Sequence, residues 1–343
     1  MKLATGAGYW SAGPPADAAA KIVRAEELGY DSFWTAEAYG SDAFTPLAWW
    51  GSSTRSIKLA TGIAQMSART PTATAMAAIT LDHLSGGRFI LGLGASGPQV
   101  VEGWYGQPYP RPLARTREYV EIIRRVVARE APVTFDGDFY QLPFPGGTGL
   151  GKALKPTVHP IRNRIPIYLA AEGPRNVALA AEICDGWLPL FMSPHADDHY
   201  REALAAGFER GGGSEDFEVV CPVTVLPTET TGEDDMNRAA DAMRPMLALY
   251  MGGMGAKGAN FHHDVFVRMG YGEVADRVQD LYLAGHKQEA AAAIPLELVS
   301  QVSLVGTPEK IRDDLAAWEE SVVTTLMVSG PAEVLPLMAE LCL

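Results

Sequence analysis

The sequence has 343 residues, a formal net charge of −13 at pH 7, 47% hydrophobic residues and 20% charged residues. A chain of this composition can bury a large core and is not intrinsically disordered. Its negative charge argues against nucleic acid and against anionic membranes as partners, because both would repel the protein at long range.

The amino terminus and the cysteines indicate a cytoplasmic protein. The first residues, MKLATG, enter a strand-like run rather than a signal peptide, and no apolar run approaches the ~20 residues that span a bilayer. Cys184, Cys221 and Cys342 are odd in number and lack CxxC spacing. This pattern disfavours a disulfide framework and favours a reducing compartment.

Short strand-like runs alternate with helical runs along most of the chain, which is typical of a parallel sheet with crossover helices. Strands are predicted at 2–7, 32–35, 57–63, 88–93, 165–170, near 186–187, 217–226 and 322–328. Helices are predicted at 17–28, 72–84, 115–130, 174–183 and 307–318. The number of strands is close to eight, so we expect one α/β domain over residues 1–343, a (β/α)8 TIM barrel.

Two segments interrupt this alternation. Residues 131–164 are rich in proline and glycine, and residues 233–301 are helical in pattern with a glycine-rich stretch at 252–255. Long segments of this kind in a compact domain usually carry function. We expect both to be insertions that cover the active-site end of the barrel.

Three stretches carry a resemblance to a known family. They are AEELGYDSFW at 25–34, RTP at 69–71 with TLDHLSGGRFILGLG at 80–94, and a stretch at 165–187 that begins IPIYLAAEGPR. Together they resemble the luciferase-like (bacterial luciferase) superfamily, in particular its branch that uses the deazaflavin coenzyme F420 and is related to methylenetetrahydromethanopterin reductase. The resemblance implies a barrel-shaped oxidoreductase. Because members of this family are commonly homodimers, it also implies a homodimer.

The resemblance also implies where the cofactor binds. Thr61, Gly62 and Ile63 match a peptide that in F420-binding relatives contains a non-proline cis bond beneath the deazaflavin ring. Ala95, Ser96 and Gly97 match a loop of small residues that lets a flat ring approach the backbone. Glu172, Gly173, Pro174 and Arg175 match the loop that holds the cofactor phosphate. From the residues alone, a strand-end glycine, a tight turn and a solvated arginine are the alternatives.

Glu37 is the candidate catalytic residue. It stands with Ala38 where F420-dependent sugar-phosphate dehydrogenases carry an Asp-His pair, so the carboxylate is kept and the histidine is lost. Those enzymes also carry a glutamate near the position of Gly97, and its absence here argues against sugar-phosphate oxidation as this chain's reaction. A carboxyl group in the cavity could relay the proton that balances hydride transfer; a solvated loop acid is the alternative.

Aromatic residues favour an apolar substrate pocket, and the histidines do not favour a metal site. Trp10, Phe44 and Trp104 are the candidate pocket residues, although part of the aromatic set must be core. The run His262, His263 and Asp264 could suggest a metal site, and so could His195 with His199, which could share a helix face. No third ligand and no HExxH pattern accompanies His195 and His199. We expect no bound metal.

These observations lead to one hypothesis and two alternatives. The hypothesis is hydride transfer between coenzyme F420 and a small organic molecule, an apolar unsaturated or carbonyl compound. The first alternative is an FMN-dependent luciferase-like monooxygenase. The second is a non-catalytic F420-binding protein.

Overall fold

The computed structural model describes residues 1–211, 213 and 215–343, and its centre is a closed barrel of parallel strands. The barrel strands are β1 (Lys2–Gly6), β2 (Ser32–Thr35), β3 (Lys58–Thr61), β5 (Phe89–Gly94), β8 (Ile167–Ala170), β9 (Gly186–Leu188), β10 (Glu218–Pro227) and β12 (Thr325–Ser329). Each strand pairs in parallel with the next, and β12 pairs with β1. The predicted (β/α)8 barrel is confirmed.

Two short strands extend this sheet. β4 (Ala64–Gln65) follows β3 and pairs with the end of β5, and β11 (Ser303–Gly306) pairs with the second half of β10. β4 matters for the site because it continues the chain directly from the carboxyl end of β3.

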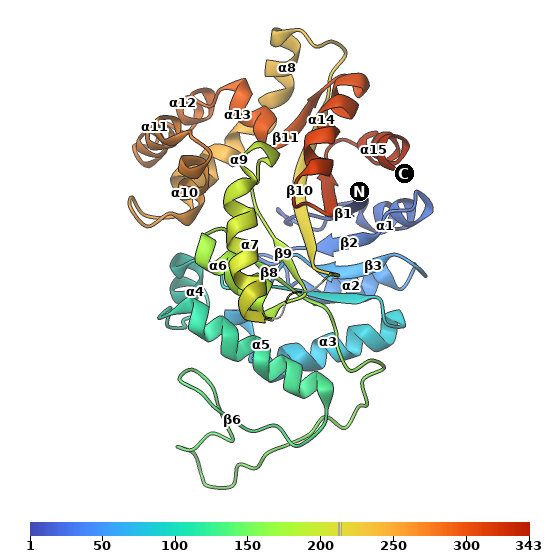
Figure 1. Ribbon diagram of the computed structural model, residues 1–343, viewed down its shortest axis with the longest axis vertical. Coiled ribbons are helices and arrows are strands. Elements are labelled where there is room, and N and C mark those ends of the chain that lie inside the picture. Colours follow the sequence, from blue (N-terminus) through green and yellow to red (C-terminus); the bar gives the residue numbers. More distant parts are fainter. Residues whose placement is uncertain (212, 214) are drawn as a thin grey trace.

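Helices surround the barrel (Figure 1). They are α1 (Ala18–Glu27), α2 (Phe44–Gly51), α3 (Pro71–Ser85), α4 (Pro98–Gly103), α5 (Pro112–Ala128), α6 (Pro174–Ile183), α7 (Asp198–Gly211), α14 (Pro308–Glu320) and α15 (Val334–Cys342). The α3 helix shows why local signals work: the Thr70 side chain accepts a hydrogen bond from the Ala73 amide, and Gly86 ends the helix in the left-handed conformation. The helix α2 was not predicted, although Asp42 caps it: its Oδ1 atom accepts hydrogen bonds from the amides of Phe44 and Thr45, each at 2.8 Å.

The alternation of side chains along each strand separates two cores. On β2, Phe33 packs outward against the helices, whereas Trp34 points into the barrel. The barrel interior is filled by Ala4, Trp34, Ala60, Ile90, Tyr168, Leu188 and Val220. Small residues on some strands leave room for the rings of Trp34 and Tyr168, whose centroids are 6.0 Å apart. The barrel is therefore a packed core and not a pore.

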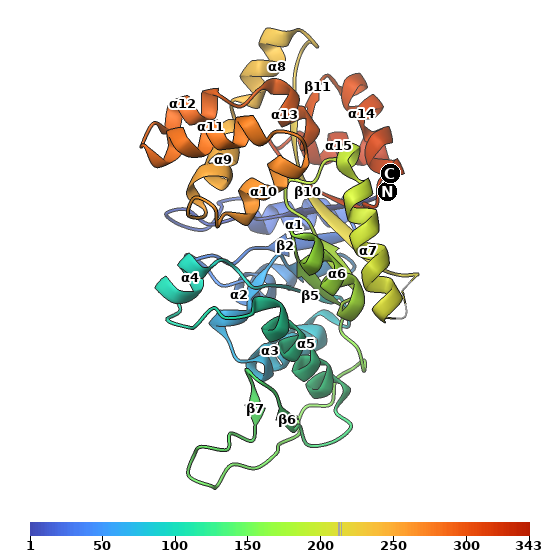
Figure 2. The same ribbon diagram turned by 60° about the vertical axis from the view of Figure 1, so that its left-hand side comes forward.

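The segment 131–164 leaves the barrel after α5 and forms an arm (Figure 2). It contains the antiparallel strands β6 (Phe135–Asp136) and β7 (Gln141–Leu142). The Glu118 carboxylate on α5 accepts hydrogen bonds from backbone amides of residues 138–140, and Arg162 binds Asp82 on α3. The arm therefore lies along the outer helices, and not over the carboxyl ends of the strands.

The segment 233–301 forms a helical unit with its own apolar core. Its elements are α8 (Glu233–Ala240), α9 (Arg244–Ala248), the π-helical turn η3 (Leu249–Gly253), α10 (Phe261–Arg268), α11 (Gly272–Leu283), α12 (Lys287–Ala292) and α13 (Leu296–Gln301). Leu247, Met251, Phe266, Val278 and Leu298 are fully buried in it. Arg268 donates a hydrogen bond to the backbone oxygen of Glu172, just after β8, so this unit lies against the carboxyl end of the barrel.

No helix among the described residues combines the length and the apolar character that crossing a membrane requires.

Candidate active site

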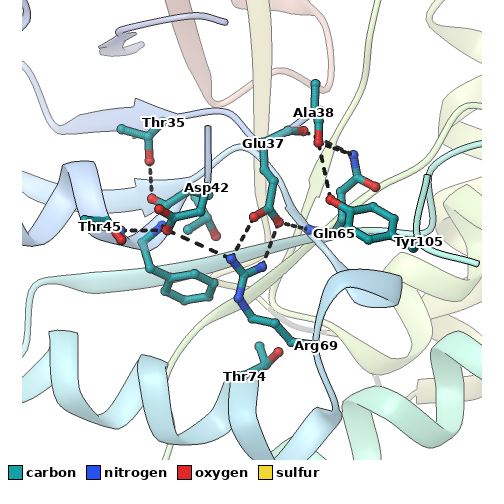
Figure 3. A network of polar contacts seen from close by, with 12 residues as sticks. Thr35, Glu37, Ala38, Asp42, Thr45, Gln65, Arg69, Thr74 and Tyr105 are labelled. Atoms are coloured by element: carbon teal, nitrogen blue, oxygen red, sulfur yellow. Dashed lines mark hydrogen bonds and ion pairs between the residues drawn. The ribbon is translucent and has the colours of Figure 1, made fainter. Parts of the chain in front are cut away.

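Glu37 lies at the carboxyl end of β2 and is bound by Arg69 (Figure 3). Arg69 donates from Nη1 to Oε2 at 2.8 Å and from Nη2 to Oε1 at 2.7 Å. The Gln65 amide donates to Oε2 at 2.8 Å, and Glu37 is only 5% exposed. The hydrogen bonds to Glu37 raise the pKa of Arg69 above its usual value. Because both oxygens are engaged, this geometry makes Glu37 an anchor for β4 and for Arg69; its catalytic role stays a prediction.

The predicted cis peptide is present between Gly62 and Ile63. The neighbouring Thr61 hydroxyl donates to the Gly92 carbonyl at 2.8 Å and accepts from the Gly92 amide at 2.9 Å, which joins β3 to β5. A Cβ atom on Gly62 would lie 2.9 Å from the Trp34 ring, and Ile63 packs against the same barrel interior. Thr61 is thus fully buried, while Gly62 and Ile63 are half-buried at the strand end.

The loop of Ala95, Ser96 and Gly97 follows β5 and is half-buried. Ser96 has a positive φ of 58°, and its carbonyl accepts a hydrogen bond from the Tyr109 hydroxyl at 2.8 Å. Gly97 precedes the first residue of α4, and a Cβ atom there would lie 3.7 Å from the ring of Phe261. The loop therefore lies between the barrel and the helical unit.

The predicted phosphate loop follows β8. Gly173 is the N-cap of α6, and Pro174 and Arg175 are exposed in its first turn. Glu172 instead points to the helical unit, where its Oε1 lies 2.7 Å from Nδ1 of His262. The structure thus brings Gly173, Pro174 and Arg175 together at a helix N-terminus, a position where backbone amides can meet an anion.

The candidate pocket residues divide between core and surface. Phe44 is buried against Phe89, with the Arg69 guanidinium 4.9 Å from its ring centre. Trp10 packs on Trp50, at 5.8 Å between ring centres. Trp104 is 64% exposed and lies 6.4 Å from the ring of Tyr39, which follows β2. Trp104 is therefore the one of these three that stands open at the barrel mouth.

Sequence reasoning named His262 only as part of a possible metal cluster and did not connect it with the tyrosines near it in the fold. Tyr250 on η3 and His262 on α10 have ring centres 4.8 Å apart in an edge-on arrangement. Tyr9, after β1, lies close enough to Tyr250 for the two hydroxyl groups to influence each other's pKa. Tyr9 is 60% exposed, and desolvation raises its pKa. No local signal could have joined these residues.

The histidines do not form the arrangement that their spacing suggested. His195 lies in the short 3-10 turn η2 (Pro194–Ala196), whereas His199 is on α7, so the expectation of one shared helix face was wrong. Among residues 1–211, 213 and 215–343, no group of three or more His, Cys, Asp or Glu side chains could hold a metal ion. The three cysteines are free.

Buried acceptor atoms provide a test of whether the site fits a cofactor. Oε1 of Gln65, Oε2 of Glu172 and Oδ1 of Asn176 are buried and have no hydrogen-bond partner within the described part of the chain. The side-chain amide of Gln65 is oriented by its Nε2 atom, which donates hydrogen bonds to the backbone oxygens of Glu37 and Ala38. This orientation leaves Oε1 as the atom without a partner. Gln65 is on β4, directly after β3, whereas Glu172 follows β8 and Asn176 is in the first turn of α6. Because unpaired buried acceptors are costly, they indicate a ligand that carries hydrogen-bond donors, as the imide and hydroxyl groups of a flavin-type cofactor do.

A closed (β/α)8 barrel with such acceptors at its carboxyl end is typical of a cofactor-dependent enzyme. The family model for luciferase-like monooxygenases matches residues 3–325, and the chain belongs to this family. It is 57% identical over 339 residues, 97% of this chain and 96% of the other, to a Mycobacterium tuberculosis protein named provisionally as a coenzyme F420-dependent oxidoreductase.

Two further similarities involve reductases. The chain is 30% identical over 314 residues to the 5,10-methylenetetrahydromethanopterin reductase of Archaeoglobus fulgidus, covering 90% of this chain and 87% of the other. The solved structure of the coenzyme F420-dependent tetrahydromethanopterin reductase from Methanopyrus kandleri matches with a TM-score of 0.80 at 22% identity, over 99% of this chain and 98% of that one. The match to the Methanopyrus kandleri structure supports the assignment of the barrel fold.

Proposed function

We propose that this protein is a coenzyme F420-dependent oxidoreductase that exchanges a hydride with an apolar unsaturated or carbonyl compound. The observation that carries the proposal is the set of buried acceptors without donors, one on β4 and two in the segment from Glu172 to Asn176 after β8. The 57% identity to the Mycobacterium tuberculosis protein favours F420 as the cofactor that supplies these donors. When bound, the deazaflavin supplies the hydride chemistry.

The residues of the chain have distinct tasks in this proposal. Thr61, Gly62 and Ile63 support one side of the ring, and the loop of Ala95, Ser96 and Gly97 borders it. The acceptor of Gln65 binds a donor of the ring. At the N-terminus of α6, Gly173 and Arg175 meet the phosphate through backbone amides and the guanidinium.

The substrate class follows from the mouth of the barrel. Tyr9, Tyr39, Trp104 and Phe261 keep between 37% and 64% of their surface exposed there. Aromatic side chains offer a large apolar surface with few charges, which suits an apolar substrate better than a sugar phosphate. Tyrosine hydroxyl groups can bind a substrate carbonyl.

A titration of the purified protein with F420 and, separately, with FMN tests the cofactor. We expect F420 fluorescence to change at micromolar protein and FMN absorbance to stay unchanged. Binding of FMN alone would overturn the proposal in favour of the luciferase-like monooxygenase.

Activity is tested by oxidation of reduced F420 in the presence of enones, cyclohexenone-like compounds and simple ketones. We expect turnover with at least one member of this set. If F420 binds and every compound is inert, the non-catalytic alternative is supported instead.

We further propose that the protein is a homodimer whose second copy covers the arm. Exposed apolar side chains gather on the arm, namely Phe144, Leu150, Leu154, Val158 and Ile161. Met76 and Leu84 on α3, to which the arm is bound by Arg162, are exposed as well. A monomer rarely leaves so many large apolar groups open on one face.

A further inference from the structure

A buried acid and a buried histidine join the helical unit to the barrel. Oε1 of Glu172 lies 2.7 Å from Nδ1 of His262, and each side chain is 9% exposed. The two atoms are close enough for an ion pair, but their geometry does not meet that of a hydrogen bond. The other carboxylate oxygen of Glu172, Oε2, has no hydrogen-bond partner among the described residues. A cofactor donor at Oε2 would not explain the contact between Oε1 of Glu172 and His262, although an isolated buried charge is costly.

The position of His262 is fixed by an N-cap. The Asn260 side-chain oxygen accepts hydrogen bonds from the amides of His262 and His263, at 3.1 and 3.3 Å. Its Nδ2 atom donates to the carbonyls of Tyr250 and Met251, each at 2.8 Å. Asn260 therefore holds the start of α10 against the turn η3, and with it the ring of His262 beside Tyr250.

From this pair, tyrosine side chains lead toward the open mouth. The ring of Tyr250 lies edge-on to His262, and burial, together with the contact to Tyr9, raises the pKa of Tyr250. Tyr9 in turn is 60% exposed. The groups that face His262 are Glu172, the ring of Phe261 at 4.3 Å and the ring of Tyr250. Arg268 binds the backbone oxygen of Glu172, and Tyr9 and Tyr39 lie near Tyr250. On its other side, His263 contacts Asp264 and Asp276.

Hydride addition to a carbonyl or an activated double bond requires one proton. The electron pair of the double bond moves to the oxygen or to the α-carbon, and that atom must be protonated. Glu37 is poorly suited because both of its oxygens accept hydrogen bonds from Arg69. A histidine titrates near neutral pH, and a neighbouring carboxylate favours its protonated form.

We propose that His262, paired with Glu172, supplies this proton, an inference that rests on the function proposed above. The substrate carbon accepts the hydride, its π electrons move to the substrate oxygen or α-carbon, and a proton leaves the His262 imidazolium for that atom by way of the tyrosine hydroxyls at the mouth. Solvent then returns a proton to the imidazole. Glu172 is a positioning residue that stabilises the charged ring.

The pairing is tested on the protein without cofactor. The pKa of His262 is measured from the ring nitrogen signals by NMR, with the signals assigned by their loss in His262→Gln. We expect Glu172→Gln to lower this pKa, because it removes the adjacent negative charge. The matched control is His263→Gln, which changes the neighbouring histidine and should leave the pKa of His262 in place. An unchanged pKa in Glu172→Gln would overturn the pairing.

The proton transfer is tested with F420 and an accepted substrate. We expect His262→Gln to bind F420 within about twofold of the unmodified protein, while kcat falls by ~100-fold, the lower end for loss of a general acid. The decline of kcat as pH rises should also disappear, and Glu172→Gln, which preserves shape, should shift that decline to lower pH. His263→Gln should keep the original profile.

An unchanged pH profile in His262→Gln would overturn the proposal. If the unmodified protein does not bind F420, the proposed function and the proton transfer both fail, whereas the NMR result still decides whether Glu172 and His262 are paired. The two failures are therefore distinguishable.

Discussion

The guanidinium of Arg69 binds both carboxylate oxygens of Glu37, at 2.7 and 2.8 Å, and the pair lies directly under the candidate site. The Glu37 side chain is 4% exposed and that of Arg69 is 22% exposed. Since the same carboxylate also binds the amide of Gln65, it determines where β4 begins.

We predict that Glu37→Gln destabilises the protein by about 2 to 3 kcal/mol, because it removes the nearer of the two carboxylates that face a largely buried guanidinium and leaves only Asp42, at 3.9 Å. Urea unfolding followed by circular dichroism measures this change. The control is Asp138→Asn, which breaks an ion pair with Arg111 whose side chains are 65% and 63% exposed; it should cost about 0 to 1 kcal/mol. If the two variants lowered the free energy of unfolding equally, burial would not explain the contribution of the Glu37–Arg69 pair to stability.

A side chain at position 92 on β5 should cause a severe packing defect. A Cβ atom there would lie 1.8 Å from the backbone oxygen of Thr61, which cannot move without breaking the contact between β3 and β5. We expect Gly92→Ala to yield little soluble protein or a melting temperature lowered by more than about 10 °C, as a loss of several kcal/mol implies. Gly103→Ala on α4 is the control, because its Cβ atom meets nothing within 4 Å; it should be neutral or slightly stabilising.

The lowered pKa of Glu26 predicts that the protein loses free energy of unfolding in acid. Partial burial raises its pKa, but hydrogen bonds from the amides of Ile57, Ser56 and Arg55 outweigh this and lower the pKa from 4.5 to about 2. A folded-state pKa below the unfolded value gives stability that is present above pH 4.5 and is lost as the pH falls toward 2.

Unfolding by urea between pH 7 and pH 3 should therefore show a smaller decline in Glu26→Gln than in the unmodified protein. Glu27→Gln is the control, since Glu27 is exposed and contacts only Arg24 among its described ion-pair partners. An equal decline in all three proteins would contradict the prediction.

The exposed apolar side chains of the arm lead us to predict a dimer in solution. Light scattering should give twice the mass of the 36.8 kDa chain. Replacing Phe144 and Leu150 by serine should shift the mass toward that of one chain, because these side chains are 70% and 85% exposed on the face assigned to the second copy. Leu283→Ser on α11 changes a similarly exposed apolar residue, 53% accessible, outside the arm and should leave the mass unchanged. A monomeric unmodified protein would contradict the assignment.

Much of the fold could be predicted because its signals are local. The helix at 174–183 has the predicted bounds, and α3 begins after Thr70 and ends before Gly86 as its sequence indicated. The strand at 32–35 was likewise predicted with its observed bounds. The cis peptide at Gly62 and Ile63 was predicted from the resemblance and not from any local signal.

The candidate site was predicted less completely. Residues after β3, β5 and β8 were named, and the structure places all three groups at the carboxyl end of the barrel. Phe44, however, is packed against Phe89, because its place at the start of α2 turns it toward the strands. A sequence shows that an aromatic side chain will be buried but not which of two cores it will enter.

The sequence by itself determined the barrel and the positions of its strand ends, since caps, glycines and the alternation along strands act over a few residues. Only the tertiary structure decided that Arg69 occupies both oxygens of Glu37 and that His262 meets Glu172. The physical reason is that both pairs depend on contacts between segments distant in the chain, and the second depends on how the helical unit packs against the barrel.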